Sequence, residues 1–196
     1  MRYRKKNIVF RFLEKSNNLL NRYIKNWRRL LIVILMLAIF MLIVKNYTKI
    51  FFLTLFIILG AVSLIHTKYF GSNYIGFELC TMATVLSSLA YGPVYGAIAG
   101  FFSISLGFIL SGHFKPSYFI SVLVLPIMGL IVPLFSHLDL VYVGLIITIL
   151  YDAIILPLYV IIGGSRIVTS SIFFTTHVLL NLWIFSTIAP FFYSFI

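Results

Sequence analysis

Long apolar runs, separated by short polar segments, fill the chain from about residue 30 to its end. Hydrophobic residues make up 62% of the 196 residues and charged residues only 10%, whereas about a quarter of the residues in soluble domains are charged. Backbone groups cannot stay unpaired in hydrocarbon, and the runs show no strand-like alternation, so they are predicted to be helices. The sequence therefore predicts an all-α integral membrane protein.

Seven apolar segments are defined by the polar residues between them. They are Leu30–Val44, Ile50–Ile65, Ile75–Tyr91, Pro93–Leu110, Tyr118–Phe135, Leu140–Ile162 and Ile167–Phe192. The last six form the predicted bundle of six core transmembrane helices, within residues 50–196. The first segment has only 15 residues, which is short for a crossing of about 20 residues. Within residues 30–49 we therefore expect a short apolar helix, either interfacial or an extra span, and a hairpin.

Residues 1–29 form a basic tail with ten of the 15 Lys and Arg residues and a single acid, Glu14. Its apolar residues recur every three or four positions, which is typical of an amphipathic helix on an anionic membrane surface. No stacking or groove-reading module accompanies the positive charge. The predicted partner of the tail is therefore the lipid bilayer and not a nucleic acid.

The distribution of basic residues predicts a multi-pass protein of the cell (cytoplasmic) membrane with a cytoplasmic N-terminus. With seven crossings, Lys68, Lys115 and Arg166 lie on the same side as the tail. With six crossings, Lys45 and Lys49 do so instead. Both arrangements satisfy the positive-inside rule, so charge alone leaves six and seven spans open.

A ladder of small residues follows the turn dipeptide Gly92-Pro93. Its members are Gly96, Gly100, Ser103 and Gly107, and steps of three and four place them on one helix face. Small residues let two helix backbones approach closely in lipid, where no hydrophobic force drives association. We expect this face to pack inside the bundle or to dock a partner protein.

Two acids lie within the apolar segments, where a charged side chain is costly. Asp152 is near the middle of its segment, where a carboxylate costs about 2.5–3.5 kcal/mol, so it should face the bundle interior or a wet cavity. Glu78 is about one turn into its predicted helix, where it can reach the interface and where the helix N-terminus stabilises its charge. Each acid is a candidate substrate-binding residue. The alternatives are a helix tie for Asp152 and a helix cap for Glu78.

The last segment carries further polar candidates. His177 and Asn181 are four residues apart and share one helix face, with Trp183 nearby. An imidazole and an amide can orient a small polar molecule by hydrogen bonds, and an indole offers a stacking surface. The alternative is helix–helix hydrogen bonding beside an aromatic core.

The sequence contains none of the common catalytic motifs. It lacks HExxH, G-x-S-x-G, a P-loop and any Cys/His cluster, and Cys80 is its single cysteine. We therefore expect a protein that is not an enzyme and that holds no metal or cofactor. Transport against a gradient would need energy from a partner or from an ion gradient.

Three consecutive stretches resemble a known family of membrane proteins. They are LSSLAYGPVYGAIAGFFSISLGFILSG (86–112), KPSYF (115–119) and LVLPIMGLIVPLF (123–135). Together they are similar to the substrate-binding S components of energy-coupling factor (ECF) transporters, in which a G-P turn is followed by glycines at four-residue steps. The matching residues are Gly92, Pro93, Gly96 and Gly100 in the first stretch and Pro126 and Gly129 in the last.

The resemblance implies a six-helix protein that captures a small polar micronutrient, such as a vitamin, near its outer face. It implies a binding site under the loop 66–74, beside Glu78. It also implies two kinds of protein partner, a transmembrane T subunit and cytoplasmic ATPases, which would energise uptake.

Two other functions remain open from the sequence. One is a non-catalytic multi-span scaffold, similar to MreD-like cell-shape proteins, whose glycine face docks other membrane proteins. Such a scaffold predicts a fully packed interior without a polar cavity near Asp152. The other is an ion-coupled carrier or channel that uses Asp152 as its titrating group.

Overall fold

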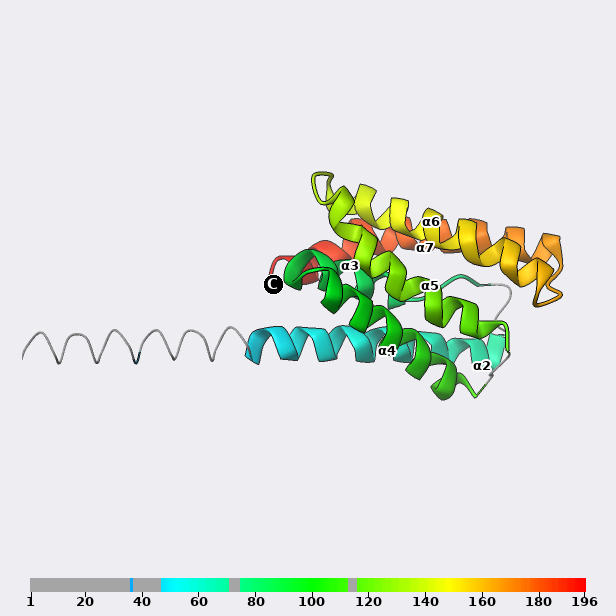
Figure 1. The fold of residues 1–196 in the computed structure, drawn as a ribbon, viewed down its shortest axis with the longest axis horizontal. Coiled ribbons are helices and arrows are strands. Elements are labelled where there is room, and N and C mark those ends of the chain that lie inside the picture. Colours follow the sequence, from blue (N-terminus) through cyan, green and yellow to red (C-terminus); the bar gives the residue numbers. More distant parts are fainter. Residues whose placement is uncertain (1–35, 37–46, 71–74, 113–115) are drawn as a thin grey trace, which may run out of the picture. The chain divides into compact units, whose positions relative to one another are not determined.

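The computed structural model describes residues 36, 47–70, 75–112 and 116–196. The tail 1–29 and nearly all of Leu30–Val44 lie outside these residues, so the predictions for them stay predictions. The chain divides into two units, Met1–Tyr47 and Thr48–Ile196, and the description below concerns the second. Its described residues form helices and no strands, which confirms the all-helical prediction (Figure 1).

Within the part of the chain that the structure describes, five helices are long and apolar enough to cross a membrane. They are Tyr47–Tyr69, α4 (Pro93–Ser111), Tyr118–Phe135, α6 (Leu140–Ile161) and α7 (Ile167–Tyr193). The first contains the 3₁₀ turn η1 (Leu64–His66) and leads into α2 (Thr67–Phe70), and the third consists of α5 (Tyr118–Ile131) and the 3₁₀ turn η2 (Val132–Phe135). These bounds lie within a few residues of the predicted ones.

The prediction of a helix over Ile75–Tyr91 is wrong in its first turn, because α3 begins only at Cys80 and ends at Tyr91. The preceding backbone has partners other than helical carbonyls. The Gly76 amide donates to the Thr176 hydroxyl at 3.0 Å, and the Leu79 amide donates to Ser63 Oγ at 2.8 Å. Non-helical backbone at membrane depth is tolerated where protein groups satisfy it in this way.

Helix α3 is the centre of the bundle. All nine residues from Cys80 to Ser88 are buried, and α3 contacts α4, α5, α6 and α7. At about 1.5 Å per residue its 12 residues span about 18 Å, whereas the hydrocarbon core is about 30 Å thick. Helix α3 can be short because protein, and not lipid, surrounds it.

The turn between α3 and α4 matches the predicted Gly92-Pro93 turn. Gly92 has a φ of 102°, a value that side chains other than glycine rarely adopt. Pro93 follows in the first turn of α4, where its missing N–H removes no helical hydrogen bond.

The ladder of small residues faces the inside of the bundle. Gly96, Gly100, Ser103 and Gly107 are all buried. Helices α4 and α5 approach closely, because a Cβ on Gly129 would lie only 2.4 Å from the carbonyl carbon of Gly96. The Ser88 hydroxyl donates to the Gly129 carbonyl oxygen at 2.7 Å, which joins α3 to the same crossing.

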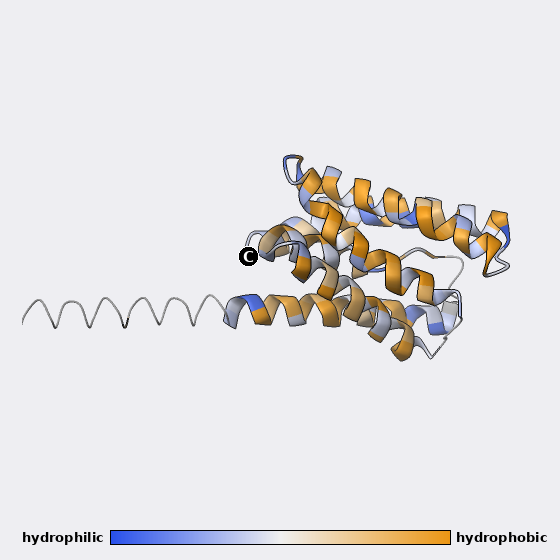
Figure 2. Cartoon of the chain, in the orientation of Figure 1, coloured by the Kyte–Doolittle hydropathy of each residue, from blue (hydrophilic) through white to orange (hydrophobic). Residues whose placement is uncertain are grey.

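The outward faces of the helices carry large apolar side chains. On α5, for example, Leu123, Ile127 and Leu130 are about half exposed or more. Figure 2 shows such hydrophobic residues along the length of the long helices. Side chains of this kind suit contact with lipid chains.

Replacing Gly129 by Ala should destabilise the bundle, because the added methyl group would overlap the backbone of α4 at Gly96 and Ala97. Overpacking of this kind costs about 1–3 kcal/mol, and about 2–4 °C of melting temperature is lost per kcal/mol in a chain of this size. Thermal unfolding in detergent measures the effect. The control is Leu130→Ala, one residue further and exposed. An unchanged melting temperature for Gly129→Ala would contradict the close crossing.

Candidate functional site

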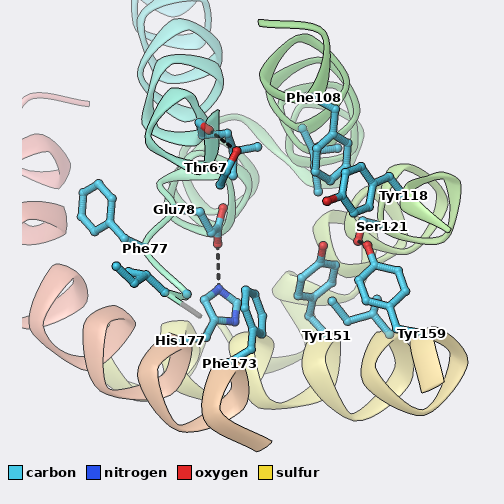
Figure 3. A pocket seen from close by; sticks show the side chains of 15 residues that line it. Thr67, Phe77, Glu78, Phe108, Tyr118, Ser121, Tyr151, Tyr159, Phe173 and His177 are labelled. Atoms are coloured by element: carbon cyan, nitrogen blue, oxygen red, sulfur yellow. Dashed lines mark hydrogen bonds and ion pairs between the residues drawn. The ribbon is translucent and has the colours of Figure 1, made fainter. Parts of the chain in front are cut away.

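A histidine on α7 lies between two carboxylates from other parts of the chain. His177 Nδ1 is 2.9 Å from both carboxylate oxygens of Asp152 on α6. Its Nε2 is 3.0 Å from Oε1 of Glu78, which precedes α3. Asp152 and His177 are fully buried and Glu78 is 8% exposed. The three side chains, here called the Glu-His-Asp cluster, thus connect three segments of the bundle. Figure 3 shows the contact between Glu78 and His177.

The hydrogen bonds of the Glu-His-Asp cluster determine its charge. Each of the two contacts to His177 needs one proton, so two protons are shared among the three side chains. With both protons on the imidazole, the cluster is one imidazolium between two carboxylates, with a net charge of −1. This two-proton state is the one that makes the hydrogen bonds of the cluster, in which Glu78 also accepts from the Thr81 amide.

Glu78 is located differently from the prediction. It does not lie one turn inside a helix at the interface but precedes α3, where both its oxygens accept from the Thr81 amide at 3.0–3.1 Å. It therefore caps α3 and also reaches His177. Both contacts depend on the non-helical conformation of segment 75–79, because a helix over these residues would place the Glu78 carboxylate in a different position.

Gly76 allows the segment before Glu78 to lie directly on α7. A Cβ at Gly76 would be 2.5 Å from both Cα and Cβ of His177, so a side chain there would push the segment away. The Thr176 hydroxyl, which accepts from the Gly76 amide, lies one residue before His177. The approach that joins Glu78 to His177 therefore depends on a glycine and a hydroxyl.

A cavity opens beside the cluster, at the end of the bundle where α7 begins. The centre of a water molecule can occupy about 70 Å³ of it, which is several times the 10–15 Å³ that one water needs. Its polar lining residues are Thr67, Glu78, Ser121 and His177. Its aromatic lining residues are Phe77, Phe108, Tyr118, Tyr151, Tyr159 and Phe173. Figure 3 shows these side chains converging from several helices.

The aromatic walls are held by contacts with one another and with the polar residues. The rings of Phe108 and Tyr118 stack with centroids 4.3 Å apart, and the Tyr159 hydroxyl is hydrogen-bonded to Ser121. Phe173 packs on the His177 ring with centroids 5.2 Å apart. The walls therefore combine flat apolar surfaces with a few hydroxyl groups, as small-molecule sites do.

The structure brings together only some of the predicted substrate-binding residues. Glu78 and His177 line the cavity, and Asp152 lies behind His177. Asn181 is buried but does not line it, and its amide nitrogen donates to the His177 carbonyl oxygen at 3.1 Å. Trp183 is 52% exposed and absent from the lining. Trp183 lies away from this cavity because residues 177 and 183, six apart, lie on different faces of a helix.

Sequence reasoning missed the aromatic lining and Gly76. One signal was present, since Tyr151, Ile155 and Tyr159 recur every four residues and so share one face of α6, and all three line the cavity. Phe173 stands in the same relation to His177. Nothing in the local sequence distinguishes Gly76 from a loop glycine, because its role depends on α7, about 100 residues away.

Within the described residues, no group of three or more His, Cys, Asp or Glu side chains is arranged to hold a metal ion. The Glu-His-Asp cluster uses both imidazole nitrogens for its own hydrogen bonds. The side chains of the Glu-His-Asp cluster can form hydrogen bonds to a bound molecule and can compensate its charge.

Comparisons with protein-family models, with curated proteins and with solved structures found no match to this chain. Its function is therefore argued from the site alone.

Replacing Thr176 by Val should lower stability, because the isosteric side chain cannot accept from the Gly76 amide. A buried donor without a partner costs about 1–3 kcal/mol. Thr176→Ser keeps the hydroxyl and should stay close to the parent protein. Thermal unfolding of the two variants in the same detergent makes the comparison. Equal melting temperatures for the Val and Ser variants would show that the hydrogen bond does not hold segment 75–79 in place.

Proposed function

We propose that this protein is a membrane-embedded substrate-binding subunit for uptake of a small polar micronutrient, energised by partner ATPase and T subunits as in ECF transporters. The observation that supports this best is the cavity lined by aromatic rings and by Glu78, Ser121 and His177. A protein that only binds and delivers its solute needs such a cavity and no catalytic group of its own.

The place of the cavity agrees with capture from outside the cell. It lies at the end of the bundle that contains η1, α2 and the start of α7, opposite the Gly92-Pro93 turn. Thr67, within the predicted covering loop 66–74, and residues 75–78, directly after it, contribute to its lining. With the basic tail in the cytoplasm and six crossings, this end faces outward.

The same cavity argues against a purely packed scaffold. That alternative predicts an interior without a polar cavity near Asp152, whereas His177 both contacts Asp152 and lines a cavity. The ion-coupled carrier is the second candidate, since the buried Glu-His-Asp cluster holds protons in mid-membrane side chains. Transport by the isolated chain in liposomes, blocked by Asp152→Asn, would favour that carrier over a binding subunit.

A ligand should co-purify with the protein and survive native mass spectrometry. Ile155 is buried and lines the cavity, so Ile155→Trp should fill the space and abolish the bound mass. The matched control is Ile154→Trp, where the neighbouring side chain is 41% exposed and the ligand should be retained. A protein without any bound small molecule and without copurifying ATPase or T-like subunits would overturn the proposal.

The C-terminus should lie in the cytoplasm. Six crossings, made by the five long helices and α3, would return the end of α7 to the side on which the helix Tyr47–Tyr69 starts. A reporter fused after Ile196 that is active only in the cytoplasm should therefore be active, whereas one active only outside should be silent. The reverse result would mean that Leu30–Val44 crosses the membrane, and the cavity would then face the cytoplasm.

A further inference from the structure

We propose that the cavity selects an organic cation, that is, a small molecule with a protonated amine or a charged aromatic ring. This inference rests on the proposed binding function and names the chemical class of its ligand. It follows from the charge of the Glu-His-Asp cluster, from the absence of Lys and Arg among the described lining residues, and from the aromatic walls.

The first step concerns charge. The Glu-His-Asp cluster carries a net charge of −1 when its two hydrogen bonds to His177 are made. It is buried in the part of the chain that spans the membrane, where an uncompensated charge is costly. A cation in the cavity beside it would bring the local charge to zero.

The second step is that the described residues supply no such cation. Among the residues that the structure describes, the cavity lining contains no Lys or Arg. Lys68 and Arg166, which belong to the same end of the bundle, are both exposed. A bound cation can therefore compensate the negative charge of the Glu-His-Asp cluster, whereas a bound anion would add to it.

The third step is the position of Glu78, the acid that lines the cavity. Its Oε1 faces His177, while its Oε2 is 3.0 Å from the Thr81 amide. A carboxylate oxygen can accept two hydrogen bonds, so Oε2 keeps capacity for a further donor. An ammonium group would supply both the proton donor and the charge.

The fourth step is the aromatic lining. Six rings surround the space, and aromatic faces attract cations through their quadrupoles, more strongly where water is excluded. Neutral molecules of the same shape would gain the apolar contact without this attraction. The walls and the cluster thus favour the same class of ligand.

Size-matched probes test the inference on the purified full chain in nanodiscs. Benzylammonium, benzyl alcohol and benzoate have the same ring and differ in charge. Titration calorimetry or thermal shift should show benzylammonium binding at least about tenfold more tightly than benzyl alcohol, with benzoate weakest. Equal binding of the alcohol, or tighter binding of benzoate, would overturn the inference.

A variant pair assigns the selectivity to Glu78. Glu78→Gln should remove most of the preference for benzylammonium over benzyl alcohol. Asp139→Asn, the same change at an exposed position before α6, should leave it intact. Should Glu78→Gln fail to fold, the three probes on the unaltered protein still test whether the cavity prefers a cation. Retained selectivity in a folded Glu78→Gln protein would contradict the assignment.

Failure of this inference is distinguishable from failure of the proposed function. A neutral or anionic molecule found by native mass spectrometry would overturn the cation inference and leave the binding function standing. A copurified cation would support both. Absence of any copurified molecule, together with no binding of the three probes, would overturn both.

Discussion

The buried hydrogen bonds of His177 to Glu78 and Asp152 are the interaction on which the bundle interior depends. Two carboxylates inside a membrane protein need partners, and a single imidazole here serves both, at 2.9–3.0 Å. The cost of leaving either carboxylate unpaired in a low-dielectric interior is several kcal/mol. This cost favours the orientation of α6 and α7 in which Asp152 and His177 face each other and His177 also meets Glu78, just before α3.

Close backbone approach makes that interaction geometrically possible. Gly76 lets a non-helical segment lie on α7, and hydroxyls of Ser63 and Thr176 satisfy the backbone amides that the missing helical turn leaves free. Gly96 and Gly129 bring α4 and α5 together on the other side of α3. The cavity lies among these elements, between Glu78 and the aromatic side chains of α5 and α6.

Much of the architecture could be predicted, because insertion into a membrane is a local property. The bounds of α4, α6 and α7 follow from apolar runs of about 20 residues, and the Gly92-Pro93 turn follows from its dihedral requirements. The interior position of Asp152 followed from the cost of burying a charge. The start of α3 could not be predicted, because the residues of segment 75–79 are compatible with a membrane helix. The segment is non-helical only because its backbone amides bind hydroxyl groups on distant helices.

The sequence by itself determined that this chain forms membrane helices, where most of them begin and end, and that Asp152 faces the interior. Only the tertiary structure decided that the two acids meet one histidine, that Trp183 faces outward and that six aromatic rings surround a cavity. The physical reason is distance along the chain. The contacts of His177 join residues 25 and 99 positions apart, and such pairings depend on how whole helices pack and not on any window of local sequence.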